Sequence, residues 1–457
     1  LILRNLMHGL VYLDTNLQIN SRVLSSWAYD SGKKTYHMVI DKNSKWSDGK
    51  PVTSRQFIRA FEQMLKQEFG QRFAYSYQEI AGMQEALKTR KLPAGVKYIN
   101  DQSFDIVLSR NSSNFLEKLT YWFFYPIRED LRPISREHID VPTNGDYRVT
   151  QFTASHMRLE QNPHGAISAT APKIIEITVF KDADAAIKAL VNGEIDLVPK
   201  VNPTDALPYV SSQSHPWQVS DFMDFTTVYL VFNFGLPFGK EMNNRSIFTA
   251  AIDKAKTIYD SKMSASVARC LVPFGLPGHL SELSKNSTQA AYAAPVPQKL
   301  SRPIKLLCHD TVLEVCRSVS RQVTQKTGWD IEIKHFRPEL FFIESKTNNY
   351  DVYLTTASGL DSVSYMESFT SDKNAFHWSD KQYDELVHNS YLAPSTGELI
   401  EYVRVTQNLL CVEHKVMMAL MHLNASVAHS KRVKGIHMNP LLSLDFSKIS
   451  LSQSVGR

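Results

Sequence analysis

Apolar and polar positions alternate in the first clearly patterned segment of the chain. Tyr36, Met38 and Ile40 are spaced two residues apart, which is typical of a strand with one buried face. The residues at 47–49 then read Ser-Asp-Gly, and this composition favours a turn, because glycine adopts positive φ at low cost. The pattern predicts a strand that leads into a turn, with Trp46 exposed in front of it.

A helix is predicted directly after this turn. Thr53 has the position of an N-cap, and Gln56, three residues later, has that of its partner in a capping box. Apolar residues at helical spacing follow and form one stripe, which a helix buries against its neighbours. The residues of this stripe are Phe57, Ile58, Phe61 and Leu65.

Strands and helices alternate again further along the chain. The segment 182–198 reads as a helix, an Asn-Gly stop and a buried strand, and 339–354 repeats this plan. Between them, 304–336 has the pattern strand, helix, Gly328, strand, which predicts a βαβ unit with parallel strands. The segment 272–303 is rich in proline and polar residues and is predicted to be a long loop.

Two such α/β regions indicate two lobes. In open α/β sheets, ligands bind beyond the carboxyl ends of the strands. Two sheets that face each other form a cleft that a hinge can close. The coarse pattern therefore favours a binding protein of the α/β class.

Length and composition narrow the class of protein. A chain of 457 residues is long enough for about three domains. The net charge of +5 is spread along the chain, and no basic stripe with interleaved aromatic residues is present, so we expect no nucleic-acid partner. No apolar stretch approaches the roughly 20 residues that a membrane-spanning helix needs.

The first residues and the cysteines leave the cellular compartment of the protein open. The start of the chain lacks a basic region and a cleavage site of a signal peptide, so the protein is either cytosolic or given without a removed leader. Cys270, Cys308, Cys316 and Cys411 show no zinc-ligand spacing, so no metal is predicted, and their disulfide state stays open. Cys308 and Cys316 are expected to be small buried residues.

The sequence lacks the common motifs of catalysis and cofactor binding. The chain contains no glycine-rich dinucleotide fingerprint, no phosphate-binding loop and no nucleophile elbow. The histidine pairs His414 and His422, and His429 and His437, are each eight residues apart, which does not fit a helical metal clamp. We therefore expect no enzyme and no cofactor.

Several motifs in the same order resemble one known family. Residues 46–61 read WSDGKPVTSRQFIRAF and are similar to the signature of the extracytoplasmic solute-binding proteins of family 5, the oligopeptide-, dipeptide- and nickel-binding receptors of ABC importers. Further matches are the segments NGDYRVTQF, AIKALVNGEIDLV, VYLVFNFGLPF and FHWSDKQYDELV. They follow the family order over nearly the whole chain, and we expect the chain to begin inside the first domain.

The resemblance implies a two-lobed periplasmic-binding-protein fold of type II, similar to cluster C, with an additional α+β domain. It places the first lobe at 1–11, 147–254 and 431–457, and the second lobe at 255–430. Residues 12–146 would form the additional domain, packed on the first lobe. The strand and helix at 36–65 would then be a structural part of that domain, away from the ligand.

The family resemblance also points to a ligand site, where this sequence departs from the pattern. Peptide-binding members carry an aspartate after the second-lobe strand that pairs with the α-ammonium of the peptide. Here residues 350–369 are two residues short, so this position falls on Ser358 or Leu360, and Ala357 takes the place of a tryptophan. Asp361, with Ser358 and Gly359, is the predicted anchor, and a helix cap is the alternative role of Asp361.

The family pattern assigns the first-lobe wall of the cleft to Tyr229, Asn233 and Phe234, at the end of the strand VYLVFNF. Packing in the core is the alternative for the two aromatic residues.

Two functions stay open at this point. The first is a monomeric periplasmic or cell-surface receptor that captures peptides, or another small solute such as a metal chelate, for a membrane-embedded ABC permease. The second is a cytosolic ligand-sensing use of the same fold.

Overall fold

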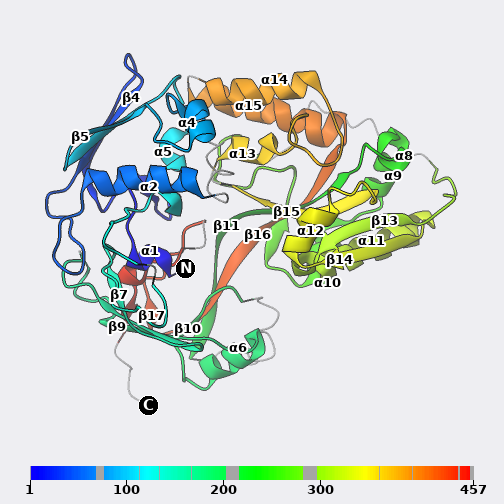
Figure 1. Ribbon diagram of the computed structural model, residues 1–457. Coiled ribbons are helices and arrows are strands. Elements are labelled where there is room, and N and C mark those ends of the chain that lie inside the picture. Colours follow the sequence, from blue (N-terminus) through cyan, green and yellow to red (C-terminus); the bar gives the residue numbers. More distant parts are fainter. Residues whose placement is uncertain are drawn as a thin grey trace. The chain divides into compact units, whose positions relative to one another are not determined.

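The computed structural model of the protein (Figure 1) describes residues 2–67, 77–112, 114–132, 134–165, 167–201, 216–280, 296–359, 361–393, 395–440 and 443–452. Contacts divide the chain into two compact units. Unit 1 comprises Leu1–Val201, Asp205–Phe222 and Val427–Arg457, and unit 2 is chiefly Met223–Ser426, as far as the structure describes them.

The first predicted strand and helix are confirmed in unit 1. The strand is β4 (Thr35–Ile40), which pairs with β3 (Leu24–Asp30) and β6 (Ser103–Val107) in an antiparallel sheet completed by β5 (Val96–Asn100). Its residues alternate between buried and exposed, as the apolar pattern requires. The helix is α2 (Ser54–Lys66), whose buried face contributes Phe57, Phe61 and Leu65 to the core below this sheet.

The start of α2 is fixed by its cap. Thr53 is the N-cap, and the capping box predicted with Gln56 is present. The Gln56 side chain has a second partner that local reasoning did not reveal: its Oε1 accepts a hydrogen bond of 3.0 Å from Trp46 Nε1.

The prediction that Trp46 is exposed was wrong. Its exposed fraction is 0%, and it belongs to the hydrophobic core of unit 1. The Arg128 guanidinium lies 5.1 Å from the centre of the indole ring, and Arg128 is itself held by both oxygens of Asp48. Arg128, 82 residues further along the chain, therefore covers a side chain that the residues next to Trp46 in the sequence would leave exposed.

The rest of unit 1 contains a second antiparallel sheet and the predicted helix and strand at 182–198. The sheet consists of β7 (Tyr147–Phe152), β8 (His156–Gln161) and β9 (Ile174–Thr178). The helix is α6 (Ala183–Val191), and the strand is the short β10 (Leu197–Val198). The remaining elements are α1 (Leu3–Leu6), β1 (Tyr12–Leu13), β2 (Ile19–Asn20), α4 (Met83–Thr89), α5 (Phe115–Lys118), η2 (Trp122–Phe124), β17 (Val433–Lys434), η6 (Phe446–Lys448) and β18 (Ser450–Leu451).

The βαβ unit predicted at 304–336 is confirmed in unit 2. Strand β13 (Ile304–His309) runs parallel to β14 (Ile331–Phe336), and α11 (Leu313–Thr327) connects them. Gly328 ends the helix with φ of 72°, a left-handed conformation that glycine adopts without strain. Strand β15 (Val352–Ser358) pairs in parallel with β13 on its other side.

Two long strands complete this sheet. Strand β11 (Trp217–Phe232) pairs antiparallel with β15, and β16 (Met417–Ser430) pairs with β12 (Ala265–Val267). Each of these two long strands has one end in unit 1 and the other end in unit 2. Strand β10 pairs with the end of β16 that belongs to unit 1.

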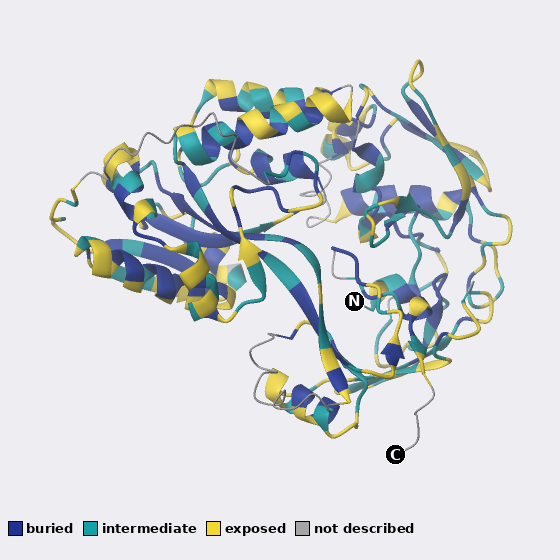
Figure 2. Ribbon diagram, turned by 180° about the vertical axis from the view of Figure 1, so that it is seen from behind, coloured by how far each residue is buried: buried dark blue, intermediate teal, exposed yellow. Residues whose placement is uncertain are grey.

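The core of unit 2 lies between this sheet and its helices. The inner strands are buried along most of their length, as expected for parallel strands covered by helices, whereas the helices keep an exposed side (Figure 2). Val315, Val319 and Val323 form the buried stripe of α11. The other elements are α8 (Pro237–Lys240), α9 (Met242–Ala250), α10 (Lys254–Ser261), η4 (Asp310–Val312), α12 (Pro338–Glu344), α13 (Ser362–Glu367), α14 (Lys381–Leu392), α15 (Thr396–Asn408) and η5 (Leu409–Glu413).

The other predictions for unit 2 agree with the described residues. Helix α12, the left-handed Asn348 and strand β15 form the predicted succession at 339–354. The described parts of the predicted loop, 272–280 and 296–303, contain no helix and no strand. Residues 281–295 lie outside the described residues. No helix in the described part of the chain is long and apolar enough to cross a membrane.

The unit boundary differs from the expected lobe boundary at 254–255. Unit 2 begins at Met223, because β11 pairs with β15 from Thr226 to Phe232 and so packs with the second half of the chain. The three-part division into two lobes and an additional domain stays a prediction.

Candidate functional site

The end of strand β15 carries an exposed pair of hydroxyl groups. Thr226 of β11 lies opposite Ser358 of β15, and their hydroxyl oxygens are 2.7 Å apart. Ser358 is exposed, whereas Gly359 and Asp361 are buried. We call Thr226, Ser358, Gly359 and Asp361 the β15 edge; it contains three of the predicted ligand residues.

Close packing behind the β15 edge explains the glycine in it. A Cβ atom on Gly359 would lie 2.2 Å from Ser364 Oγ and 3.0 Å from the Tyr365 ring, so a larger residue does not fit without movement. The Tyr365 hydroxyl donates a hydrogen bond to the backbone carbonyl of Phe225 and lies 3.3 Å from that of Gly359. Tyr365 thus joins α13 to β11 and holds the turn after β15 in place.

Asp361 is the N-cap of helix α13. Its Oδ1 accepts hydrogen bonds from the backbone N–H groups of Val363 and Ser364, each at 3.0 Å. The residue is 9% exposed. The alternative role predicted for Asp361 therefore has its expected geometry, while a role as anchor for a ligand cation stays a prediction.

Asn233 uses its side chain within the fold. Its Nδ2 lies 2.8 Å from Asn348 Oδ1, 2.8 Å from the carbonyl oxygen of Tyr350 and 3.1 Å from Tyr353 Oη. Its Oδ1 accepts a hydrogen bond of 2.9 Å from the backbone of Gly235. Asn233 is 0% exposed, so its side chain fixes the turn after β11.

Tyr229 and Phe234 pack among other aromatic residues. Tyr229 is 6% exposed, its ring centre lies 5.7 Å from that of Phe369, and burial raises the pKa of its phenol. Phe234 lies under the Arg245 guanidinium at 4.7 Å and 6.5 Å from Trp378.

The strand register separates the predicted residues into two groups. Thr226 lies opposite Ser358 at one end of the β11–β15 pair, and Phe232 lies opposite Val352 at the other. At about 3.4 Å per residue, Asn233 is roughly 20–25 Å along the strand from Thr226. The structure thus brings Ser358, Gly359 and Asp361 together, and places Asn233 and Phe234 away from them.

The sequence placed Asp351 at the start of a strand but did not predict that its carboxylate is buried and paired. Asp351 is 0% exposed and binds both terminal nitrogens of Arg302, at 2.6 and 2.7 Å. It also accepts a hydrogen bond of 2.9 Å from the backbone of Lys305. A carboxylate with these partners is satisfied within the fold and orders the start of β15. The sequence did not reveal that Arg302, in the predicted loop, is the partner of Asp351.

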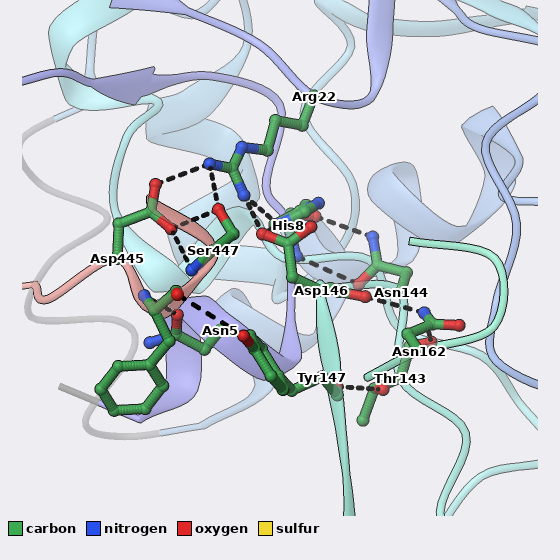
Figure 3. Close-up of polar contacts among 12 residues, drawn as sticks. Asn5, His8, Arg22, Thr143, Asn144, Asp146, Tyr147, Asn162, Asp445 and Ser447 are labelled. Atoms are coloured by element: carbon green, nitrogen blue, oxygen red, sulfur yellow. Dashed lines mark hydrogen bonds and ion pairs between the residues drawn. The ribbon is translucent and has the colours of Figure 1, made fainter. Parts of the chain in front are cut away.

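Unit 1 contains a larger polar cluster around Arg22 (Figure 3). Arg22 lies between the carboxylates of Asp146 and Asp445, and its Nη2 also donates a hydrogen bond of 3.0 Å to Ser447 Oγ. His8 Nε2 is 3.4 Å from both Arg22 and Asp146. Burial, reinforced by Arg22 and opposed by Asp445, lowers the pKa of His8 to about 3.

This cluster borders a cavity of about 330 Å³ within unit 1, lined in part by His8, Arg22 and Asp445. Arg22 and Asp445, which face the cavity, are already paired with each other, and Arg22 is also paired with Asp146. We therefore assign the cluster a structural role: it holds together segments that are up to 423 residues apart in sequence.

The cysteines divide into one disulfide and two buried thiols. Cys270 and Cys411 form a disulfide, with Cα atoms 6.1 Å apart. Cys308 and Cys316 are free and buried, as predicted, and burial raises the pKa of the Cys316 thiol. Among the residues that the structure describes, no three His, Cys, Asp or Glu side chains form a metal-binding group.

Comparison with known proteins defines the class. The profile of the bacterial extracellular solute-binding proteins, family 5, matches residues 18–376. The dipeptide-binding protein DppE of Bacillus subtilis is 21% identical, with 97% of this chain and 86% of DppE covered. The probable deoxycholate-binding periplasmic protein YgiS of Escherichia coli is 20% identical, with 85% of this chain and 77% of YgiS covered.

A solved structure has the same fold. The murein tripeptide binding protein MppA of Escherichia coli superimposes with a TM-score of 0.79 at 16% identity, over 99% of this chain and 94% of MppA. The protein thus has the two-lobed α/β fold of solute-binding proteins, which confirms the predicted fold class. The chain belongs to the bacterial extracellular solute-binding proteins of family 5.

Proposed function

We propose that this protein is the receptor of an ABC importer and captures dipeptides or oligopeptides outside the cytoplasm. It delivers them to a membrane-embedded permease, acts as a monomer, and is either free in the periplasm or anchored at the cell surface. The observation that carries this proposal is the family match over residues 18–376, together with relatives named for dipeptide and murein tripeptide binding.

The β15 edge is the part of unit 2 that we propose to contact the peptide. It follows the carboxyl end of a strand that is parallel to its neighbour β13, and loops in this position bind ligands in open α/β sheets. The hydroxyl groups of Thr226 and Ser358 can both donate to and accept from a peptide backbone. Tyr229, Asn233 and Phe234 order strand β11 and the turn that follows it, and we propose that they support the site through this strand.

Asp361 provides negative charge at this edge. A carboxylate can pair with the α-ammonium of a peptide by a charge-assisted hydrogen bond, worth on the order of 1.5–3 kcal/mol. Its role as N-cap is compatible with this pairing, because a capping carboxylate keeps its charge. We propose both roles for Asp361, and they are separable by substitution.

Native mass spectrometry of protein purified without denaturation tests the proposed function. We expect retained ligands with peptide masses, which tandem fragmentation identifies. Calorimetric titration of each identified peptide and of its N-acetylated form into ligand-free protein follows, and we expect acetylation to weaken binding at least tenfold. Ser358→Ala is expected to weaken binding, whereas the control Ser26→Ala, an exposed strand serine of unit 1, is expected to leave it unchanged. A protein that retains and titrates no peptide would contradict the proposal.

A ligand without a free ammonium group is the second candidate. The cap geometry of Asp361 and its 9% exposure favour it, as does the relative named as a probable deoxycholate-binding protein. In the same experiment this class would be recognised by a retained non-peptide mass, and by affinity that does not respond to Asp361→Asn.

A further inference from the structure

Two histidine rings lie next to each other in unit 2, and His422 contacts Thr227, the neighbour of Thr226 in the β15 edge. The ring centres of His279 and His422 are 5.7 Å apart and their planes are inclined by 62°. His422 is on strand β16 and 5% exposed, and His279 is partly exposed on the segment after β12. Neither residue belongs to a family motif identified in the sequence.

A backbone contact determines which nitrogen of His279 carries the proton. Nδ1 lies 2.9 Å from the carbonyl oxygen of Val272. A carbonyl oxygen only accepts hydrogen bonds, so the proton is on Nδ1. In the neutral ring, Nε2 then has a free lone pair.

His422 has the same proton arrangement for a related reason. The Thr227 hydroxyl oxygen lies 2.8 Å from the carbonyl oxygen of Leu271 and 2.8 Å from His422 Nδ1. The hydroxyl group of Thr227 has one proton, which it donates to the carbonyl oxygen of Leu271. It can then only accept a hydrogen bond from His422, so the proton of His422 is on Nδ1. His422 Nε2 is then an acceptor, and it is buried with no hydrogen-bond partner in the described part of the chain.

The segment that carries His279 is held firmly. Gln407 accepts a hydrogen bond of 2.9 Å from the backbone of Val272 and donates one of 2.9 Å to the carbonyl of Gly278. Gly278 has φ of +82°, and a Cβ atom there would lie 2.4 Å from Val403. The Cys270–Cys411 disulfide fixes the same segment at its other end. The two rings are thus pre-organised in the absence of any ligand.

We propose that His279 and His422 bind one first-row transition-metal ion, Zn²⁺ or Cu²⁺, through their two Nε2 atoms. Two imidazoles that ligate one ion at about 2.1 Å have ring centres roughly 5–6 Å apart, in agreement with the observed separation. Imidazole nitrogen suits both ions, and histidine ligands usually donate the other ring N–H to a nearby oxygen, as both do here. Water would occupy the remaining positions, because no third His, Cys, Asp or Glu joins these two among the described residues.

Lys254 is expected to lower the affinity of this site for a metal ion. Its ammonium acts on His422 electrostatically and donates a hydrogen bond of 2.7 Å to the carbonyl of Ala268. A positive charge nearby disfavours a divalent cation, so we expect weaker binding than in a complete structural zinc site. Cu²⁺ should bind more tightly than Zn²⁺, in line with the usual affinity order of these ions.

The test is calorimetric titration of CuCl₂ and ZnCl₂ into protein without a polyhistidine tag, after treatment with a chelator. We expect about one equivalent to bind to the wild type, with an affinity at least tenfold lower in His279→Gln, whose partly exposed ring is replaced without a core cavity. The matched control is His156→Gln, a histidine of unit 1 that pairs with Glu176 at 2.6 Å, and it should retain the equivalent.

Two further readouts make the result decisive. Electron paramagnetic resonance of the first Cu²⁺ equivalent should show two nitrogen ligands in the wild type and fewer in His279→Gln. Raising the Zn²⁺ concentration should raise the melting temperature of the wild type and not that of the variant. If the wild type binds no ion, the proposal is overturned. Equal binding by wild type and His279→Gln would overturn it as well.

Discussion

The carboxylate of Asp361 accepts a hydrogen bond of 3.0 Å from the backbone N–H of Ser364, and this contact begins helix α13. The same carboxylate follows a strand end at which a ligand is proposed to bind. Asp361 is therefore expected to contribute both to the stability of the protein and to its affinity for the ligand, and substitutions can separate these two contributions.

Asp361→Asn should leave stability nearly unchanged and weaken peptide binding, because asparagine is as good an N-cap as aspartate but has no charge. Asp361→Ala removes both functions and should lower the free energy of unfolding by about 0.5–2 kcal/mol. Denaturant unfolding and calorimetric titration of the retained peptide measure the two effects. Equal affinity of the wild type and Asp361→Asn would show that the residue is a cap alone.

Arg22→Met should destabilise the protein by about 3–5 kcal/mol, because it leaves the buried carboxylate of Asp146 without its cationic partner. The matched control is Arg55→Met. Arg55 also pairs with an aspartate, Asp101, but both side chains are about two-thirds exposed and screened by water, so the loss of stability should be much smaller than for Arg22→Met. Denaturant unfolding at neutral pH checks both values, and similar losses in the two variants would contradict the structural role of the cluster.

His8→Gln should flatten the dependence of stability on pH. The pKa of His8 is lowered to about 3 in the folded protein, so between pH 6.5 and 3 only the unfolded chain takes up this proton. The wild type should therefore lose stability as the pH falls through this window, by at most about 1.4 kcal/mol per pH unit from His8. Above pH 6.5 this contribution is fully present.

Glutamine keeps a neutral group beside Arg22 but does not take up the proton. Unfolding free energies of wild type and His8→Gln, measured from pH 7 down to pH 4, should therefore diverge in slope. Parallel curves would mean that His8 is protonated equally in the folded and unfolded states.

Thiol labelling should distinguish the two kinds of cysteine. In the native protein we expect no reaction, because Cys308 and Cys316 are 0% exposed and Cys270 and Cys411 are joined. Denaturation without reductant should release two reactive thiols, and denaturation with reductant all four. Mass spectrometry of the alkylated protein counts them.

Reduction of the disulfide should also lower the free energy of unfolding, by about 2–4 kcal/mol, because the bond closes a long loop in the unfolded chain. The double variant Cys270→Ser/Cys411→Ser should show the same loss without reductant. Four thiols released without reductant would contradict the pairing.

Local sequence pattern determined most of the secondary structure that could be checked. The strand β4, the capping box of α2 and the βαβ unit of β13, α11 and β14 each depend on residues within one or two turns or strands of one another. Side-chain periodicity and cap chemistry act over this range, so the sequence alone was sufficient. The order of family motifs similarly indicated the family, because such motifs record the whole fold.

The tertiary structure decided what depends on distant residues. Arg128 covers Trp46 from 82 positions away, and Cys270 finds Cys411 across 141 residues, so neither result follows from local spacing. In the candidate site, the sequence located Ser358, Gly359 and Asp361 at one strand end. It did not reveal that strand register places Asn233 at the other end of the pair, fully hydrogen-bonded within the fold. Register and ion pairing are set by which segments meet in space, and that information lies in the packing of the whole chain rather than in any single stretch of it.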